Sequence, residues 1–268
     1  MNIISKIEDD NFLKIVKKWG KDSKYFIIED CVDTYNYQKL LLNLPIINYK
    51  PIKTGTGGKP KNKVSIELNN KNKDYQELNI EFKSFIENNF NFTFLFKLLK
   101  IFEIEDIIKD KTIGFSSEDN TDFLFLCNFS CNPIIGEKVS PIRRIHLDEM
   151  NQLITGLYYI RYEDDKSEGG DLELFNYRDT SFRDVIKRKE SKGMNLGRNY
   201  FNSLMQDRKI DAKSSSDNLE KNNTKKFNGN SCIFWKNSID AIHSVTDRFD
   251  AEYPRQYISF GFYKNKKT

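Results

Sequence analysis

Histidine is scarce in this sequence, because 268 residues contain only His146 and His243. The four cysteines form no Cys-x-x-Cys pair and predict no zinc site, so we expect reduced and mostly buried thiols. Basic residues exceed acidic ones by only four charges, without the concentrated excess of a nucleic-acid binder. No apolar run is long enough to span a membrane, and the first residues become acidic too early for a signal peptide. These absences favour a protein of the reducing cytoplasm that binds neither nucleic acid nor membrane.

Phenylalanine and tyrosine are abundant, with 21 and 13 residues, and supply much of the expected core. Apolar residues at helical spacing predict helices within 1–20, 34–45, 74–90 and 92–110, and a buried strand at 24–30. From residue 121 the pattern changes to short runs rich in β-branched and aromatic residues, separated by turns. These runs predict strands at 122–131, 143–148, 153–163, 170–177, 231–237, 241–247 and 255–264. Helices followed by many strands indicate an α+β, mainly β protein built on a sandwich or barrel.

We expect one domain over residues 1–268. Residues 1–120 would supply supporting helices and strands, and residues 121–177 and 230–268 would form the β core. Residues 178–229 interrupt the strands with a charged, partly helical stretch and then a polar stretch that is typical of a mobile loop. This segment is predicted to be an insertion and a candidate lid, as is the glycine-rich loop at 54–63.

The sequence around His146 is "RRIHLDEM", in which Asp148 follows two positions later. Residues i and i+2 of a strand point to the same face, so the imidazole and the carboxylate are predicted to lie side by side. A second imidazole from another strand would complete the set of two histidines and one carboxylate that binds Fe(II) in non-haem oxygenases. His243 is the only other histidine. Zinc accepts the same ligand types, so ligand chemistry alone leaves that metal open.

Twelve positions after His243, Arg255 opens the strand "RQYISF". The period of two places Arg255, Tyr257 and Ser259 on one face of this strand. A guanidinium flanked by hydroxyl groups is suited to bind a carboxylate through two hydrogen bonds.

In this order, "HLD", "AIHSV" and "RQYIS" resemble the motifs of the Fe(II)- and 2-oxoglutarate-dependent oxygenases. The overall sequence pattern most resembles the prolyl-4-hydroxylase-like branch of that family. The segments "LITGLYYIRYEDDKSEGGDLELF" and "CIFWKNSIDAIHSVT" are also similar to the family, and only about 178–229 lies outside the resemblance. The resemblance implies a double-stranded β-helix, the cupin-like jelly roll, with N-terminal flanking helices. It implies a hydroxylase that uses O2 and 2-oxoglutarate and releases succinate and CO2.

The resemblance also assigns residues. It implies that His146, Asp148 and His243 bind Fe(II) and that Arg255 binds the distal carboxylate of 2-oxoglutarate. Tyr257 or Ser259 would add a hydrogen bond to this cosubstrate, although relatives commonly carry Ser two residues after the Arg, where Tyr257 stands. Tyr158 or Tyr159 could also reach the pocket, with core packing as the alternative for either.

The substrate is expected to be a small molecule, an amino acid or a peptidyl residue. Relatives that demethylate nucleic acids carry a second Arg six residues after the first, where this chain has Gly261. Asp148 favours hydroxylation over halogenation, because related halogenases replace this carboxylate with a small residue. Arg143, Arg144 and Arg161 lie near the motifs and could meet an anionic substrate, with plain surface charge as the alternative. Two other classes remain open: a cupin-type metalloenzyme that does not use 2-oxoglutarate, and a non-enzymatic jelly-roll binding module.

Overall fold

The computed structural model describes residues 3–7, 15–46, 64–132, 143–192, 196–206 and 217–266. The predicted loop at 54–63 lies outside these residues. Among the helices of the described chain, none combines the length and the apolar character needed to cross a bilayer.

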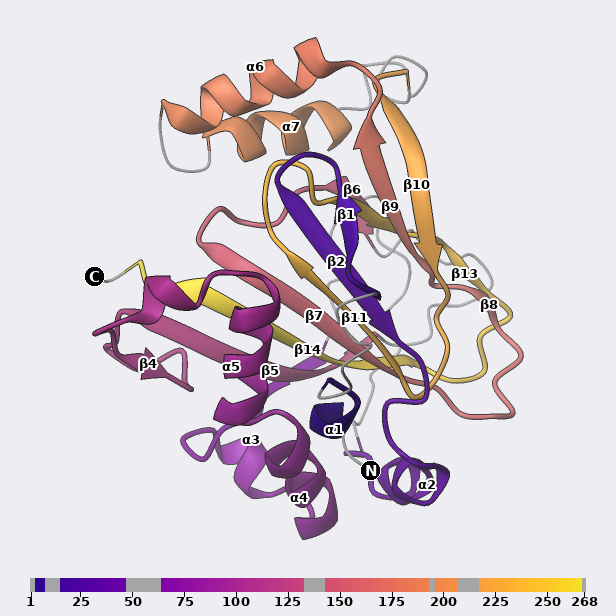
Figure 1. The fold of residues 1–268 in the computed structure, drawn as a ribbon. Helices are drawn as coiled ribbons and strands as arrows, with labels where there is room; N and C mark the ends of the chain where they lie inside the picture. Colours follow the sequence, from indigo (N-terminus) through magenta and orange to yellow (C-terminus); the bar gives the residue numbers. More distant parts are fainter. Residues whose placement is uncertain are drawn as a thin grey trace.

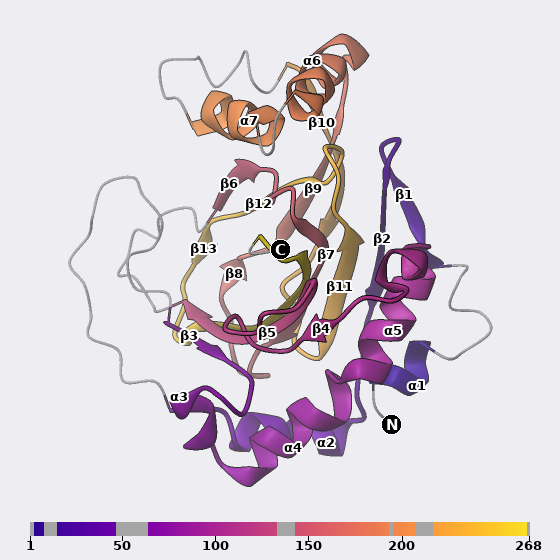
Figure 2. The ribbon, with the colours of Figure 1, turned by 90° about the vertical axis from the view of Figure 1, so that its left-hand side faces the viewer.

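Most of the strands belong to two antiparallel sheets that pack face to face (Figures 1 and 2). The large sheet has the order β1-β2-β11-β7-β14-β5-β3, and the short β4 adds to β5 in parallel. Its strands are β1 (Lys17–Trp19), β2 (Ser23–Ile28), β3 (Val64–Glu67), β4 (Ile113–Gly114), β5 (Phe123–Asn132), β7 (Gln152–Ile160), β11 (Ser231–Lys236) and β14 (Arg255–Lys264). The predicted strands at 24–30, 122–131, 153–163, 231–237 and 255–264 are therefore confirmed, with small differences at their ends.

The small sheet has the order β10-β9-β12-β6. Its strands are β6 (Arg143–His146), β9 (Leu172–Tyr177), β10 (Leu219–Lys225) and β12 (Ile242–Val245), and a separate pair joins β8 (Glu168–Gly169) to β13 (Arg248–Phe249). Leu172, Leu174 and Val245 of the small sheet pack against Ile233 and Trp235 of β11 in one buried cluster. The structure thus confirms a β-rich fold of packed sheets.

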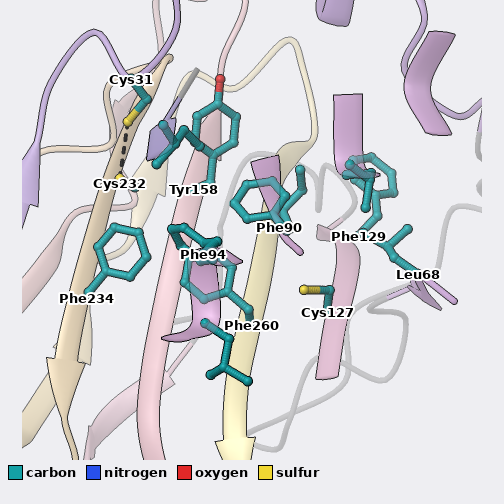
Figure 3. Close-up of a cluster of buried hydrophobic side chains, with 14 of the residues drawn as sticks. Cys31, Leu68, Phe90, Phe94, Cys127, Phe129, Tyr158, Cys232, Phe234 and Phe260 are labelled. Carbon is teal, nitrogen blue, oxygen red and sulfur yellow. Dashed lines mark hydrogen bonds between the residues drawn. The ribbon is translucent and has the colours of Figure 1, made fainter. Parts of the chain in front are cut away.

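Helices cover the face of the large sheet that points away from the small sheet (Figure 2). They are α1 (Ile3–Ile7), α2 (Thr34–Leu42), α3 (Lys73–Gln76), α4 (Ile80–Asn89), α5 (Phe92–Ile101) and the 3-10 helix η2 (Glu105–Ile108). Asn72, Asn79 and Asn91 cap the N-termini of α3, α4 and α5 by accepting a backbone N–H, which fixes where each helix begins. Phe94 of α5 packs against Phe90, Phe234 and Phe260 in the resulting aromatic core (Figure 3).

All four cysteines are buried and none forms a disulfide, as expected. The Sγ atoms of Cys31 and Cys232, at neighbouring ends of β2 and β11, lie 3.1 Å apart in the same core (Figure 3).

Two other helices, α6 (Thr180–Ser191) and α7 (Leu196–Gln206), lie beside the small sheet, on its side away from the large sheet (Figure 1). The prediction of a mobile loop over the second half of 178–229 was wrong for residues 219–225, which form β10 and pair with β9. The helix predicted within 1–20 is restricted to α1 among the described residues, and residues 17–19 form a strand instead. Trp19 explains the difference, because its ring is fully buried and its Nε1 donates to the Phe175 carbonyl at 2.8 Å.

Candidate metal centre and carboxylate pocket

The two histidines face each other across neighbouring strands of the small sheet. The register of β6 and β12 pairs His146 with His243, and their ring centroids lie 4.2 Å apart. Asp148 follows just beyond the end of β6, and its Oδ1 lies 3.8 Å from Nε2 of each histidine. Two ligands bound at about 2.1 Å to one ion lie no more than about 4.2 Å apart, so this spacing suits a shared ion. All three side chains are buried, and one ligand atom of each lies within 4.8 Å of the others.

Backbone contacts fix which nitrogen of each histidine faces the carboxylate. His146 Nδ1 lies 2.7 Å from the Arg144 carbonyl, and His243 Nδ1 lies 2.9 Å from the Ala241 carbonyl. A carbonyl oxygen only accepts, so in each histidine Nδ1 carries the proton and Nε2 offers its lone pair. Such an Nδ1–H bond to a carbonyl is the usual way in which proteins orient a metal-binding imidazole.

The second oxygen of Asp148 is held by a chain of polar side chains. Thr155 Oγ1 donates to Asp148 Oδ2 at 3.0 Å and accepts from Gln152 Nε2 and Asn237 Nδ2, each at 2.6 Å. Asn237 is oriented in turn by Trp235, whose Nε1 donates to its Oδ1 at 2.8 Å. These contacts fix Asp148 so that Oδ1 points to the two imidazoles.

The same cavity contains the carboxylate-binding candidates. Asp148, His243, Arg255, Tyr257 and Ser259 all line a pocket of about 290 Å³ between the sheets. Among the described residues, Ser259 Oγ makes one long hydrogen bond, to the Asn128 carbonyl at 3.5 Å. The structure therefore brings the residues of the three sequence motifs into one space.

Arg255 is 3 % exposed and is surrounded by aromatic rings. Its guanidinium carbon lies 4.9 Å from the ring centroids of Phe227 and Tyr257 and 5.2 Å from that of Tyr159. Its Nε donates to the Gly170 carbonyl at 3.2 Å, and the positive φ of 73° at Gly170 suits a glycine in this turn. One terminal nitrogen, Nη2, is buried and has no hydrogen-bond partner within the described ranges.

The Tyr159 hydroxyl is also buried without a hydrogen-bond partner in the described part of the chain. Burial raises the pKa of Tyr159 to about 12, although the positive charge of Arg255 acts to lower it. The phenol is therefore a neutral donor at physiological pH. A buried guanidinium nitrogen and a buried phenol that lie together, neither with a hydrogen-bond partner of good geometry among the described residues, are suited to bind an anion such as a carboxylate.

The neighbouring Tyr158 points the other way. Its ring is buried in the core beneath the helices (Figure 3). Its hydroxyl donates to Asn230 Oδ1 at 3.2 Å. Of the two tyrosines considered from sequence, Tyr159 is the one on the inner face.

Arg144 and Arg161, two of the arginines near the motifs, are not among the residues that line the pocket. Arg161 donates to the carbonyls of Phe227, Asp165 and Ser167, so its role is structural. The side chain of Arg144 is exposed, and that of Arg143 lies outside the described part of the structure.

Sequence reasoning did not identify Asn132, which pairs with Arg255 across β5 and β14. Both polar atoms of its amide are buried without a hydrogen-bond partner among the described residues. Thr155 and Asn237 were missed as well. Each owes its position to strand register, which no local motif in the sequence marks.

Comparisons with known proteins give limited similarity. No protein-family description matches the chain, and no curated protein matches it. A prolyl 4-hydroxylase from Phytophthora capsici has a TM-score of 0.48 at 12% identity, covering 98% of this chain and 65% of that protein. A 2OG-Fe(II) oxygenase family protein from Burkholderia pseudomallei has a TM-score of 0.34 at 7% identity, covering 69% of this chain and 59% of that one. The chain thus spans less than two thirds of either solved chain, and TM-scores below 0.5 establish neither its fold family nor its activity.

Proposed function

We propose that this chain is an Fe(II)- and 2-oxoglutarate-dependent oxygenase with a double-stranded β-helix core. It would hydroxylate an unactivated C–H bond of a small molecule, an amino acid or a peptidyl residue. The observation that carries the proposal is that two imidazoles and a carboxylate lie together, and that the carboxylate and the His243 imidazole line one cavity with a buried guanidinium whose Nη2 has no hydrogen-bond partner among the described residues.

The residues present fit both groups that the reaction requires. His146, His243 and Asp148 offer the donor set of a non-haem Fe(II) site and leave other coordination positions open. Arg255 and Tyr159 offer unused donors for the distal carboxylate of 2-oxoglutarate, and Tyr257 lies against the guanidinium. Bound Fe(II) would supply the chemistry that couples O2 and 2-oxoglutarate to hydroxylation, with release of succinate and CO2.

The protein's own contribution would be orientation and exclusion of water. Thr155 holds Asp148, and backbone carbonyls hold both imidazoles, so the metal ligands need little rearrangement on binding. The aromatic rings around Arg255 keep water from its guanidinium, which strengthens a charge-assisted hydrogen bond to a carboxylate.

The test is anaerobic titration of the purified protein with Fe(II) and 2-oxoglutarate, observed through the visible charge-transfer band of a chelated keto acid. The wild type should form the band. His243→Ala should bind no iron. Arg255→Met should keep iron and bind 2-oxoglutarate about 10- to 100-fold more weakly, because a hydrogen bond to a charged group contributes roughly 1.5–3 kcal/mol.

Arg144→Met is the matched control, since this arginine side chain is exposed and its change should alter neither affinity. Iron binding without the band would favour a metalloenzyme that does not use 2-oxoglutarate. A wild type that binds no iron would reject the oxygenase and favour a binding module.

A further inference from the structure

The two segments that carry the candidate metal ligands also contribute side chains to the opposite side of the small sheet. Asp148 lines the cavity and His146 lies beside it in the candidate metal group, whereas Leu147 between them is buried in a different cluster. In the same way, His243 faces the cavity and its neighbour Ile242 belongs to that second cluster. Ile186 of α6 and Phe201 of α7 belong to the same cluster. The two helices therefore pack directly behind the segments that carry the candidate metal ligands.

Asn202 of α7 binds the backbone of the residue between two ligands. Its Oδ1 accepts from Leu147 N at 2.8 Å, and its Nδ2 donates to the Leu147 carbonyl at 3.0 Å. This double contact replaces the pairing that a neighbouring strand would give, because β6 is the edge strand of the small sheet. It fixes the chain just where it leaves β6 and turns Asp148 toward the histidines.

Arg198 of α7 binds the next two residues. Its Nη1 donates to the carbonyls of Asp148 and Glu149, each at 2.9 Å. The guanidinium is anchored from α6, since its Nε lies 2.6 Å from Glu190 Oε1, and the side chain is only 6 % exposed. Arg198 thus connects both helices to the backbone of a candidate metal ligand.

Arg183 of α6 reaches the other ligand-bearing segment. Its Nε and Nη2 donate to the two carboxylate oxygens of Asp240 at 2.6 and 2.9 Å. Asp240 is 2 % exposed and immediately precedes Ala241, whose carbonyl accepts from His243 Nδ1. The contact therefore constrains the turn that orients the second imidazole.

We propose that the α6–α7 pair is a positioning element for the metal centre, with Arg198, Asn202 and Arg183 as positioning residues. The inference rests on the proposed function and replaces the expected lid role of these helices. Groups that orient metal ligands typically contribute about 10- to 100-fold to metal affinity.

The experiment titrates metal-free protein with Co(II), whose visible ligand-field band reports the geometry of the bound ion. Asn202→Leu and Arg198→Met should each raise the Kd for Co(II) about 10- to 100-fold and change the band. Asn199→Leu and Arg188→Met are matched controls, because both side chains are exposed on the same helices. They should leave Kd and band unchanged.

Arg198→Lys retains the charge beside Glu190 and should recover part of the affinity. If Asn202→Leu or Arg198→Met fails to fold, Arg198→Lys provides the test instead. Thermal unfolding of each metal-free variant shows whether it is folded. Wild-type affinity and an unchanged band in folded Asn202→Leu and Arg198→Met would overturn the inference and leave the proposed function standing. Equal losses in the controls would also overturn it. A wild type that binds no Co(II) and no Fe(II) would reject the proposed function and the inference together.

Discussion

The two faces of the large sheet differ in how completely their polar groups are satisfied. Tyr158 and Tyr159 are neighbours on β7, and both are fully buried. On the outer face the Tyr158 hydroxyl donates to Asn230 within an otherwise aromatic core. On the inner face the Tyr159 hydroxyl lacks a partner in the described chain, as does a nitrogen of the adjacent Arg255. A buried donor without an acceptor is costly in a protein made only for stability. Within the described residues, Tyr158 on the outer face has its partner, whereas the inner face offers the unsatisfied donors of a ligand site.

The largest effect on stability should come from the outer face. Phe94→Ala removes a fully buried ring that contacts Phe90, Phe234 and Phe260. We expect the free energy of unfolding to fall by about 3–5 kcal/mol, as measured by chemical denaturation. The folded fraction should still bind Co(II) with wild-type affinity. If affinity fell as well, the outer core would also be setting the site, and the division between the faces would be wrong.

Thr155→Val lies on the inner face and, unlike Phe94→Ala, should lower the affinity for metal. The change keeps the shape but removes the donor to Asp148 and the acceptor for Gln152 and Asn237. Affinity for Co(II) should fall about 10- to 100-fold, and the free energy of unfolding should fall by about 1–3 kcal/mol because two donors lose their acceptor.

Thr112→Val is the control for this change, because Thr112 makes the same Thr–Asp contact with Asp122 at an exposed position. Metal affinity should not change in this variant. Unchanged affinity in Thr155→Val would show that the chain of contacts behind Asp148 does not orient it.

Much of the fold was predictable because burial imposes local patterns. Strands such as 255–264 alternate faces and carry aromatic residues, and the helix at 92–101 repeats apolar residues at helical spacing. The edge strand β10, "LEKNNTK", was missed because only Leu219 and Lys225 at its ends are buried. Polar, charged edge strands protect a sheet from unwanted pairing, and in sequence they look like loops.

The residues of the candidate site also fall into two groups, those that the sequence identified and those that it did not. His146, Asp148, His243 and Arg255 were identifiable because rare residues stand in a spaced pattern. The structure groups the first three, and Asp148 and His243 line one cavity with Arg255. Their supporting residues have no such pattern. Asn202 binds the residue after His146 across 55 positions of sequence, a contact that only the packing of α7 on β6 creates. Long-range geometry of this kind has no local mark in a single sequence.

A matched pair of tyrosine variants tests the comparison between the two faces, because their effects on stability are expected to have opposite signs. Tyr159→Phe removes a buried hydroxyl that has no hydrogen-bond partner in the described chain, so the ligand-free protein should become more stable by up to about 1 kcal/mol. Its affinity for 2-oxoglutarate should fall about 10-fold, because the phenol would no longer donate to the carboxylate. Thermal unfolding and the anaerobic titration measure the two effects.

Tyr158→Phe should instead lower the stability, since its hydroxyl donates to Asn230 Oδ1 at 3.2 Å. We expect a loss of about 1 kcal/mol in stability and no change in cosubstrate affinity. Two variants that behaved alike would contradict the distinction between the faces.

The smallest effect on cosubstrate affinity is expected at Ser259, which tests how far the carboxylate site extends along β14. Its hydroxyl lies in the pocket, but its one described contact is the long hydrogen bond to the Asn128 carbonyl. Ser259 stands four residues after Arg255 in the strand, whereas Tyr257 stands two residues after it and packs on the guanidinium. Ser259→Ala should therefore change the Kd for 2-oxoglutarate by less than about 3-fold, because a long neutral hydrogen bond contributes little. A loss above about 10-fold would instead indicate a charge-assisted hydrogen bond from Ser259 to the cosubstrate, and would extend the carboxylate site along β14 beyond Tyr257.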